Sequence, residues 1–506
     1  MGVLMYNYAI ENALMKKDAL MRPERPFTYL STTTGMCRSC RKLTTSRIIE
    51  RAGSVFQSNL CPDCGPQEAL IAESFSWYAG QLRTAVRSRP FNIPSNPVSK
   101  GCPHDCGPCT LHAGACNLPV FSITNACDLK CPICFTFNRP DKAYYMSKEE
   151  LSRLLDRLIE RSGPFDLINI TGGEPTLHPQ LLDLIKEAAR RPEIGRVTVN
   201  SNGMRLAREP EFCRELADAG AYVILSFDTL KKEESIRIHG RDIVAEKLRA
   251  LDNLQASGVG TTLLHVMIPG VNDTEFGDIL ALADRYSCIR SITVQTMTYT
   301  GFGGRTFEPR THLPLDRAAR FVEEATGGRL KRSFFRPLPA AHPLCYQIAY
   351  IFRWDGKLYD FSDIFIAEEF DQLLGQGYLL SPSDGSENLF RAALDRLWAE
   401  GGNEHLLAGF RSIIGELYPA SGRPPTIAER QRIGEKYVLT VYLHAHMDED
   451  NFDVARVSTC PDQVPDPEGR MIPACAYNLF YRMNDPRFWV KEGDQEPNNE
   501  VKGESR

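Results

Sequence analysis

Strand-like and helix-like patterns alternate regularly between residues 117 and 300, and this alternation constrains the fold more than any other feature of the chain. Six short apolar runs rich in β-branched residues predict strands. They are Val120–Thr124, Leu167–Thr171, Val197–Ser201, Val223–Phe227, Thr261–Ile268 and Ile292–Met297. Strands that alternate with helices form parallel pairs joined by right-handed crossovers. The sequence therefore predicts an α/β fold around a parallel sheet.

Five amphipathic helices are predicted between these strands. They cover Lys148–Ser162, Leu177–Arg190, Pro210–Ala219, Ile243–Ser257 and Thr274–Tyr286. The first helix has a capping box, because Ser147 precedes it and Glu150 lies three residues further on. In barrels built from such units, functional side chains gather at the C-terminal ends of the strands. Functional side chains are therefore expected in the residues that follow each strand.

Three cysteines, Cys127, Cys131 and Cys134, follow the first predicted strand with the spacing C-x3-C-x2-C. Three thiolates can hold three irons of a [4Fe–4S] cluster and leave the fourth iron open to another ligand. The sequence Gly172-Gly173-Glu174-Pro175 follows the second strand. Its glycines let backbone approach a ligand closely, and its proline restricts the exit. The alternative is a closed zinc site with a chance Gly-Gly-Glu-Pro sequence.

These two motifs, in this order, resemble the radical S-adenosylmethionine (SAM) superfamily. The resemblance implies a partial (β/α)6 TIM-like barrel, with a [4Fe–4S] cluster on the three cysteines and SAM on the open iron. It implies that Gly172-Gly173-Glu174-Pro175 binds the SAM amino group through Glu174. It further implies an enzyme that reductively cleaves SAM to a 5′-deoxyadenosyl radical. A low-potential donor of the flavodoxin or ferredoxin type would then supply the electron.

Further SAM contacts are expected where the next strands end. Asn200 and Ser201-Asn202-Gly203 follow the third strand, and Ser226 and Asp228 end the fourth. The resemblance implies SAM contacts for Asn200, Ser226 and Asp228, and an ordinary turn is the alternative for each. His239-Gly240-Arg241 is interpreted as an exposed helix start rather than a SAM contact.

The N-terminal cysteines form two pairs, Cys37-x2-Cys40 and Cys61-x2-Cys64, with the spacing of a zinc ribbon. Four thiolates suit Zn²⁺ or a single rubredoxin-like iron, and the sequence leaves both open. Iron would deliver electrons, whereas zinc would help a small, core-poor segment to fold. A helix is predicted directly afterwards, over Glu68–Arg87.

A second cysteine group repeats the C-x3-C-x2-C spacing and adds a fourth member. It consists of Cys102, Cys106, Cys109 and Cys116. Four thiolates predict a closed auxiliary [4Fe–4S] cluster. A second zinc site is the alternative.

The C-terminal part contains Cys345, Cys460 and Cys475, which are three ligands for a further cluster. Buried free thiols are the alternative. Cys213 and Cys288 lie on predicted helix faces and are interpreted as core residues. The cysteines predicted to bind metal must stay reduced, which favours a cytoplasmic protein.

The full cysteine order, with His342-Pro343-Leu344-Cys345, resembles the family of the archaeal tetraether lipid synthase. Many of its members are labelled dihydro-hydroxymethylpterin dimethyltransferases. The resemblance implies, first, coupling of lipid chains at an unactivated carbon. The alternative is radical C-methylation of a pterin or another small molecule. Relatives carry a cysteine where this chain has Ala340, so the sequence does not identify a fourth ligand for the C-terminal cluster.

A hypothesis of another class is a non-catalytic iron–sulfur electron carrier. An open iron argues against it, because a carrier gains nothing from such a site. For the lipid hypothesis, Tyr378-Leu379-Leu380 and Tyr437–Tyr442 are apolar stretches suited to lining a cavity, and ordinary core packing explains them equally well.

Composition limits the partners. The net charge of -5, from 59 basic and 64 acidic residues, gives no reason to expect nucleic-acid binding. No apolar run reaches the roughly 18 residues of a membrane span, so a lipid substrate would require peripheral membrane contact. The 506 residues predict several segments. They are an N-terminal helix with the ribbon (1–70), an auxiliary cluster segment (71–117), the barrel (118–300), a C-terminal α+β domain (301–490) and a disordered tail (491–506).

Overall fold

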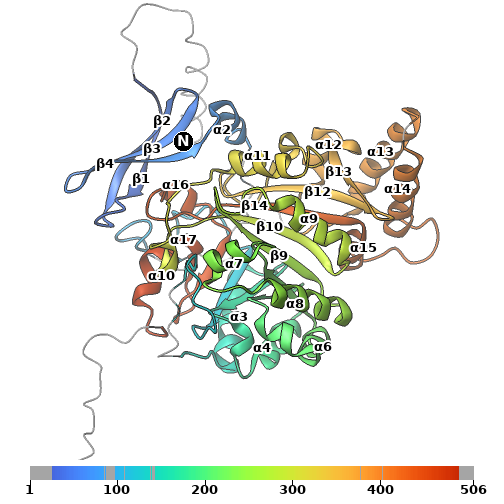
Figure 1. Ribbon diagram of the computed structural model, residues 1–506, viewed down its shortest axis with the longest axis horizontal. Coiled ribbons are helices and arrows are strands. Elements are labelled where there is room, and N and C mark those ends of the chain that lie inside the picture. The colour runs from blue at the N-terminus through green and yellow to red at the C-terminus, as the bar shows by residue number, and fades with distance from the viewer. Residues whose placement is uncertain are drawn as a thin grey trace, which may run out of the picture.

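The computed structural model describes residues 26–84, 86, 97–107, 109–136, 138, 143–375, 378–401 and 403–488. The predicted N-terminal helix lies mostly, and the predicted tail wholly, outside these residues. The first described element is a four-stranded antiparallel sheet in the order β1-β2-β3-β4 (Figure 1). Its strands are β1 (Thr28–Met36), β2 (Leu43–Arg51), β3 (Ser54–Cys61) and β4 (Gly65–Ala72).

The predicted helix over Glu68–Arg87 is wrong in its first part. Residues up to Ala72 belong to β4, and helix α2 covers only Phe75–Gln81. The turn that contains Cys61 and Cys64 returns the chain beside β3, where β4 pairs with it along its whole length. Ladder hydrogen bonds and the burial of Ala69 and Ala72 outweigh the local helix propensity.

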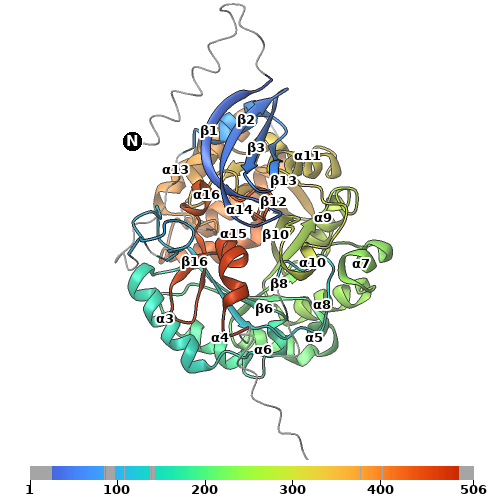
Figure 2. The ribbon, with the colours of Figure 1, turned by 90° about the vertical axis from the view of Figure 1, so that its left-hand side faces the viewer.

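The six predicted parallel strands are all present. They are β5 (Leu118–Thr124), β6 (Ile168–Gly172), β7 (Val197–Ser201), β8 (Ala221–Ser226), β9 (Thr261–Met267) and β10 (Ile289–Thr296). Each strand pairs in parallel with the next. The predicted helices are also present, as α3 (Lys148–Ser162), α4 (Leu181–Ala189), α6 (Pro210–Asp218), α8 (Val244–Ser257) and α9 (Phe276–Arg285). Figure 2 shows these helices along the outside of the sheet.

The alternation of side chains along each strand separates an outer face from an inner face. On β8, Val223 and Leu225 are buried in the core that also contains Ala250 and Leu254 of α8. Ile224, between them, faces a hollow on the other side of the sheet. The outer face is therefore a helix-covered core, and the inner face is left to line a site.

The C-terminal part of the chain adds strands at both edges of this parallel sheet. Next to β10 lie β14 (Val438–His444), β12 (Tyr346–Trp354), β11 (Arg336–Pro337) and β13 (Lys357–Asp360). Next to β5 lie β15 (Asp462–Pro465) and β16 (Met471–Pro473). The result is a sheet of 12 described strands that is continuous from the central units into the C-terminal segment.

Helices of the C-terminal part enclose a second, aromatic core. Phe352, Phe365, Phe390 and Phe410 are among its members. The helices of this part are α11 (Leu315–Ala325), α12 (Ala367–Leu373), α13 (Glu387–Ala399), α14 (Glu404–Leu417) and α15 (Ile427–Tyr437). The short helices are α5 (Met204–Arg208), α7 (Lys232–His239), α10 (Gly301–Gly304), α16 (Val454–Val457) and α17 (Ala474–Ala476). Within the described residues, no helix combines the length and the apolar character needed to cross a bilayer.

Candidate functional site

A hollow lies against the inner face of the sheet. Every parallel strand contributes to its lining, and so do β12, β14 and β15 of the C-terminal part. Phe135 and Thr136, directly after the third cysteine of the triad, also line it. The wall of the hollow is therefore formed by the parallel strands, the cysteine loop and the C-terminal segment.

The cysteines of the triad lie together in the loop after β5. Burial and repulsion from neighbouring anionic groups raise the pKa of Cys127 to about 12, and Glu174 and Cys134 are among those neighbours. Burial, then Cys134 and Cys127, likewise raise the pKa of Cys131. A cluster that binds all three thiolates removes this penalty. The three thiols therefore fit the [4Fe–4S] cluster predicted from their spacing.

The Gly-Gly-Glu-Pro turn packs directly on the cysteine loop. The amide of Gly173 donates to Thr124 O at 2.8 Å, and the amide of Glu174 donates to Ala126 O at 2.7 Å. A Cβ on Gly172 would lie 2.1 Å from Thr124 O, and a Cβ on Gly173 would lie 2.2 Å from Ala126 O. The glycines are therefore required by contact with the cysteine loop as well as by any ligand.

Glu174 joins the ends of β6 and β7. Its carboxylate accepts hydrogen bonds from Thr176 Oγ1 at 2.7 Å, Ser201 Oγ at 2.9 Å and the Asn202 amide at 2.6 Å. The side chain is almost completely buried, and burial raises its pKa. Pro175 follows as the first residue of a single 3-10 turn. The structure thus brings the two sequence-predicted groups after β6 and β7 into one site.

Asp228 and Ser226 reach the same region from β8. Burial raises the pKa of Asp228 to about 6, although nearby Lys247 lowers it. Asp228 Oδ1 accepts from the Val266 amide at 2.6 Å. Ser226 accepts from Lys247 Nζ at its carbonyl oxygen (2.6 Å) and its Oγ (2.7 Å).

Two further residues lie in this region although the sequence analysis did not assign them to the SAM site. His239 is buried, with Nε2 3.3 Å from Asp228 Oδ2 and Nδ1 3.7 Å from Cys131 Sγ. It ends α7, so its interpretation as part of an exposed helix start is wrong. Lys247 is also buried, on the apolar face of α8 with Ala250, Leu251 and Leu254. A lysine among the apolar positions of an amphipathic helix is the sequence signal that would have identified Lys247.

Asn200 lies on the wall of the hollow. Its Oδ1 is buried and has no hydrogen-bond partner among the described residues. A buried acceptor of this kind normally has a partner. The Oδ1 of Asn200 is therefore suited to accept a hydrogen bond from a bound ligand. The resemblance implies that this ligand is SAM.

The short glycine-rich helix α10 also packs against the loop that carries the triad. The Gly304 amide donates to Cys134 O at 3.0 Å. A Cβ on Gly303 would lie 2.5 Å from Pro132 O and 2.6 Å from Cys131 O. The glycine-rich sequence after β10 is thus a second support of the cysteine loop, a role that its composition alone did not reveal.

The four ribbon cysteines form a compact site. The sulfur atoms of Cys37, Cys40, Cys61 and Cys64 all lie within 4.8 Å of one another, and Cys40 Sγ lies 3.6 Å from Cys61 Sγ. Four thiolates at about 2.3 Å from one Zn²⁺ require about this separation. Burial acts against ionisation of Cys37, but backbone amides of Cys40 and Ser39 lower its pKa to about 6.

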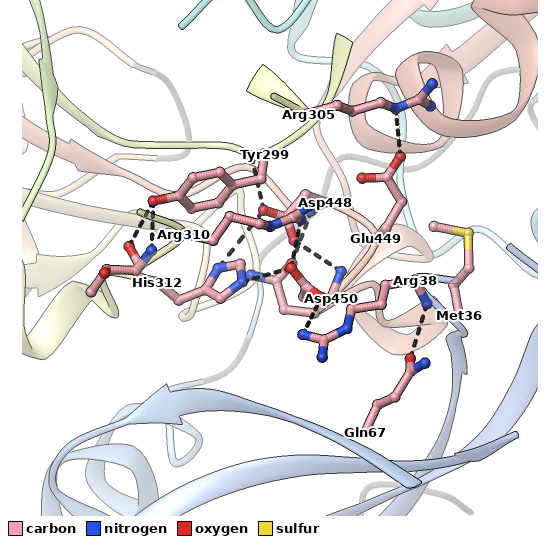
Figure 3. A network of polar contacts seen from close by, with 12 residues as sticks. Met36, Arg38, Gln67, Tyr299, Arg305, Arg310, His312, Asp448, Glu449 and Asp450 are labelled. Carbon is pink, nitrogen blue, oxygen red and sulfur yellow. Dashed lines mark hydrogen bonds and ion pairs between the residues drawn. The ribbon is translucent and has the colours of Figure 1, made fainter. Parts of the chain in front are cut away.

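The ribbon is attached to the rest of the molecule by a polar network around two buried aspartates, drawn in Figure 3. Asp450 accepts from Arg310 at 2.6 Å and His312 at 3.0 Å and pairs with Arg38 of the ribbon at 3.4 Å. Asp448 accepts from the Tyr299 amide at 2.9 Å and lies 3.8 Å from His312. We call these five side chains, Arg38, Arg310, His312, Asp448 and Asp450, the His312 network. Because arginines already neutralise Asp450, the network suits attachment rather than metal binding.

The auxiliary group is partly assembled in the structure. A hydrogen bond with Cys102, then burial and repulsion from Cys102 and Cys109, raise the pKa of Cys106, so these three thiols are close together. The Cys106 amide donates to Tyr481 Oη at 3.1 Å, and Tyr481 Oη donates to Pro103 O at 2.8 Å. Cys116 is fully buried in the core of the sheet, just before β5. Cys213 and Cys288 are core residues, as predicted.

Comparisons with known proteins agree with this site. Residues 121–283 match the family model of the Radical SAM superfamily, and residues 29–73 match the HMPTM N-terminal zinc ribbon domain. The ribbon match supports zinc at the four-cysteine site. The chain is 26% identical over 495 residues to 7,8-dihydro-6-hydroxymethylpterin dimethyltransferase of Methanocaldococcus jannaschii. That alignment covers 89% of this chain and 94% of the relative.

More distant similarities involve the central part. GTP 3′,8-cyclase of Chlorobaculum tepidum is 32% identical over 182 residues, which are 36% of this chain and 53% of that protein. Among solved structures, Streptococcus suis SuiB bound to precursor peptide SuiA aligns with a TM-score of 0.36 and 17% identity. That alignment covers 42% of this chain and 46% of SuiB.

Proposed function

The chain belongs to the radical SAM superfamily, and from this premise we propose that it catalyses radical C-methylation of a small polar heterocycle of the pterin class. Lipid-chain coupling, the first hypothesis from the sequence, has no support in the comparisons. The curated relative that matches most of the chain is named for a pterin instead. Membership of an enzyme superfamily also sets aside the electron-carrier hypothesis.

The observation that carries the proposal is a group of polar side chains on the wall of an otherwise mainly apolar hollow. Its wall includes Asn169, Thr198, Asn200 and Gln295, which lie on strands β6, β7 and β10. Thr198 already donates to Asn169. A hydrocarbon chain in this space would offer no hydrogen bond to the Gln295 amide or to the buried Asn200 Oδ1, which has no partner among the described residues; an unsatisfied buried group costs about 1–3 kcal/mol. A heterocycle with ring nitrogens and amino groups can satisfy them. The apolar part of the lining, with Tyr378, Leu379 and Tyr442, suits the faces of a flat ring.

Asp462 is the group we assign to substrate recognition. Its oxygens accept hydrogen bonds from Tyr346, at 2.6 Å, and from Tyr378. Burial raises its pKa to about 6, although both hydroxyl groups lower it. The tyrosines hold the carboxyl group in place at the wall of the hollow, where its remaining lone pairs can accept from an amino group and a ring N–H.

Around the triad, the chain's own residues position SAM and exclude water. Bound together, the cluster and SAM supply a 5′-deoxyadenosyl radical that takes a hydrogen atom from an unactivated C–H bond. Cys127, Cys131 and Cys134 would hold the cluster, and Glu174, with Gly172, Gly173 and Pro175 shaping its turn, would receive the SAM amino group. Asn200, Ser226 and Asp228 would complete the SAM site. Strands β12, β14 and β15 of the C-terminal part complete the wall of the hollow.

We further propose that Cys102, Cys106, Cys109 and Cys116 hold one auxiliary [4Fe–4S] cluster and that Cys345, Cys460 and Cys475 hold another. A low-potential donor of the flavodoxin or ferredoxin type would reduce the enzyme. The SAM that is cleaved to the radical leaves as methionine, which keeps its methyl group, so the methyl group that replaces the abstracted hydrogen would have to come from a second one-carbon donor.

The test uses anaerobically reconstituted protein with SAM, a chemical reductant and deuterated 7,8-dihydro-6-hydroxymethylpterin. We expect 5′-deoxyadenosine that contains deuterium from the pterin, and no 5′-deoxyadenosine from the Cys134→Ala variant. Asp462→Asn should raise the KM for the pterin about tenfold, equivalent to about 1.4 kcal/mol. Asp355→Asn, in the exposed β12–β13 turn, is the matched control. Deuterium transfer from a labelled lipid chain but not from the pterin would overturn the proposal.

A further inference from the structure

Arg482 is a buried cation on the wall of the hollow. It follows directly after Tyr477–Tyr481, which form a turn of π-helix, a wide turn that occurs often at functional sites. Asn478, four residues earlier, lines the hollow with it. The arginine is 4% exposed, so its guanidinium group has lost most of its contact with bulk water. A charge in such a position is costly unless it has a partner.

No carboxylate in the described part of the chain forms an ion pair with Arg482. Asp485 acts on it from beyond ion-pair distance. That carboxylate is already held by Arg487 at 2.7 Å and by the Tyr477 hydroxyl group at 2.5 Å. Asp462 lines the same hollow, but its oxygens are held by two tyrosines, and its printed ion-pair distance is to a histidine. The positive charge of Arg482 is therefore not neutralised by a neighbouring side chain.

The other neighbours of Arg482 also leave this charge unpaired. Its Cζ lies 5.2 Å from the centre of the Phe488 ring, and an aromatic face stabilises a cation without neutralising it. Cys134 acts on Arg482 as well, but the Cys134 sulfur lies 3.2 Å from Thr136 Oγ1 and has no hydrogen bond with the arginine among the described residues. Burial lowers the pKa of Arg482 in spite of Tyr477, Cys134 and other neighbours that raise it.

The hydrogen-bond donors of Arg482 are also free for a ligand. Its Nε is buried and has no partner among the described residues. Its Nη1 donates to Asn478 Oδ1 at 3.5 Å, which is long for a hydrogen bond and leaves the NH2 group of Asn478 as a further donor. Arg196, which also lines the hollow, differs because Glu435 pairs with it at 2.5 Å. A phosphate or carboxylate would both neutralise Arg482 and accept several of its N–H groups.

We propose that Arg482 and Asn478 bind an oxyanion group of the substrate, so that the heterocycle carries a phosphate ester or a carboxylate on its side chain. This inference rests on the proposed function and narrows its substrate class. The hydroxymethyl group of the pterin named for the relative is one position that can carry a phosphate ester. The oxyanion would fix one end of the substrate, and Asp462, elsewhere on the wall, would hold the amino-bearing ring.

The test measures equilibrium binding to cluster-loaded protein with SAM present and no reductant, so that no turnover occurs. The probes are 7,8-dihydro-6-hydroxymethylpterin, its phosphate ester and 6-carboxy-7,8-dihydropterin. We expect one of the two anions to bind at least about tenfold more tightly than the alcohol, and the tighter one identifies the oxyanion. Arg482→Gln should remove this preference and change the affinity for the alcohol by less than about twofold.

A second variant keeps the test decisive if Arg482→Gln folds poorly. Asn478→Asp retains the arginine but places a carboxylate beside it, so it should also remove the preference for the anion. Arg432→Gln, at an exposed position of α15, is the matched control and should keep the preference. Iron content and SAM affinity are measured for each variant, because a merely structural role of Arg482 would change these and the affinity for the alcohol as well.

The outcomes separate this inference from the proposed function. If the parent protein binds the alcohol as tightly as both anions, or if Arg482→Gln and Asn478→Asp keep the preference, the inference is wrong and the pterin proposal stands. If Arg482→Gln weakens SAM binding and leaves the preference intact, the arginine serves SAM, and the inference is also wrong. If none of the three pterins binds, the proposed function fails together with it.

Discussion

At the scale of single residues, Glu174 shows how one buried carboxylate organises a site. Donors from Thr176, Ser201 and Asn202 converge on it from the ends of two neighbouring strands. Burial disfavours its charge, and these hydrogen bonds favour it. A side chain that is already fixed in this way loses little freedom when it receives a ligand.

Glu174→Gln keeps the size of the side chain but places an NH2 group among donors. A hydrogen bond to a charged group contributes about 1.5–3 kcal/mol, so we expect SAM affinity to fall roughly 10–100-fold. Equilibrium binding of SAM to the cluster-loaded protein measures this. Glu149→Gln, at an exposed position in the first turn of α3, is the control. Equal affinity in Glu174→Gln and the parent protein would contradict the role of Glu174.

His312 makes the attachment of the ribbon sensitive to pH. Burial lowers its pKa, but Asp448 and Asp450 outweigh burial and raise it above the ordinary value of 6.5. The stabilisation from a raised histidine pKa is complete below 6.5 and is lost as pH rises through the folded-state value. We therefore expect the Tm of the parent protein to fall from pH 6 to above the raised value. In His312→Gln this fall should be smaller, and an identical pH profile would exclude the effect.

At the scale of elements, the cysteine loop is held between two glycine-containing segments. The Gly172–Pro175 turn packs on one part of the loop and α10 on another, each through backbone contacts that leave no room for a Cβ. The loop has little secondary structure of its own. Its shape before cluster binding therefore depends on these neighbours.

Gly303→Ala would force a Cβ to 2.5 Å from Pro132 O. Because backbone must move to relieve this clash, we expect fewer irons per chain after reconstitution and a destabilisation of about 1–3 kcal/mol. Gly415→Ala, in helix α14 with nothing within 4 Å of the new Cβ, is the matched control. It should be neutral or stabilising by about 1 kcal/mol. Equal iron content and stability in the two variants would contradict the proposed support.

At the scale of the whole molecule, segments far apart in the sequence close the site. The C-terminal part provides β14 beside β10 and β15 beside β5, so it flanks the parallel sheet on both sides. The ribbon is joined to this part through the His312 network and through Thr33, which donates to Asp453 at 2.5 Å. The ribbon therefore depends both on its own metal and on contacts with the body of the protein.

Cys40→Ser should remove about one zinc per chain and expose the ribbon to proteolysis, because a structural zinc site contributes directly to folding. Iron bound by the triad should remain, since the triad lies in another part of the fold. Metal analysis and limited proteolysis measure these outcomes. Retained zinc, or loss of zinc and iron together, would contradict the assignment of the ribbon as an independent zinc site.

The sequence alone was sufficient for the parallel sheet and for the four-cysteine ribbon site. Strand periodicity and short cysteine spacings are local signals, and five of the central helices began within four residues of the predicted start. The helix predicted over Glu68–Arg87 failed because strand pairing with β3 overrode local propensity. The pattern also did not show that His239 ends a buried helix beside Cys131.

What the tertiary structure decided were contacts between side chains distant in sequence. The sequence determined the superfamily, the triad and the turn that carries Glu174. Only the fold brought Lys247 to Ser226, Asp462 to two tyrosines, and His446 to Cys475. Local patterns report periodicity and backbone preference, whereas these contacts depend on how strands are ordered and which edges the C-terminal segment joins. Short motifs therefore indicated the type of chemistry, and long-range packing determined which side chains surround the site.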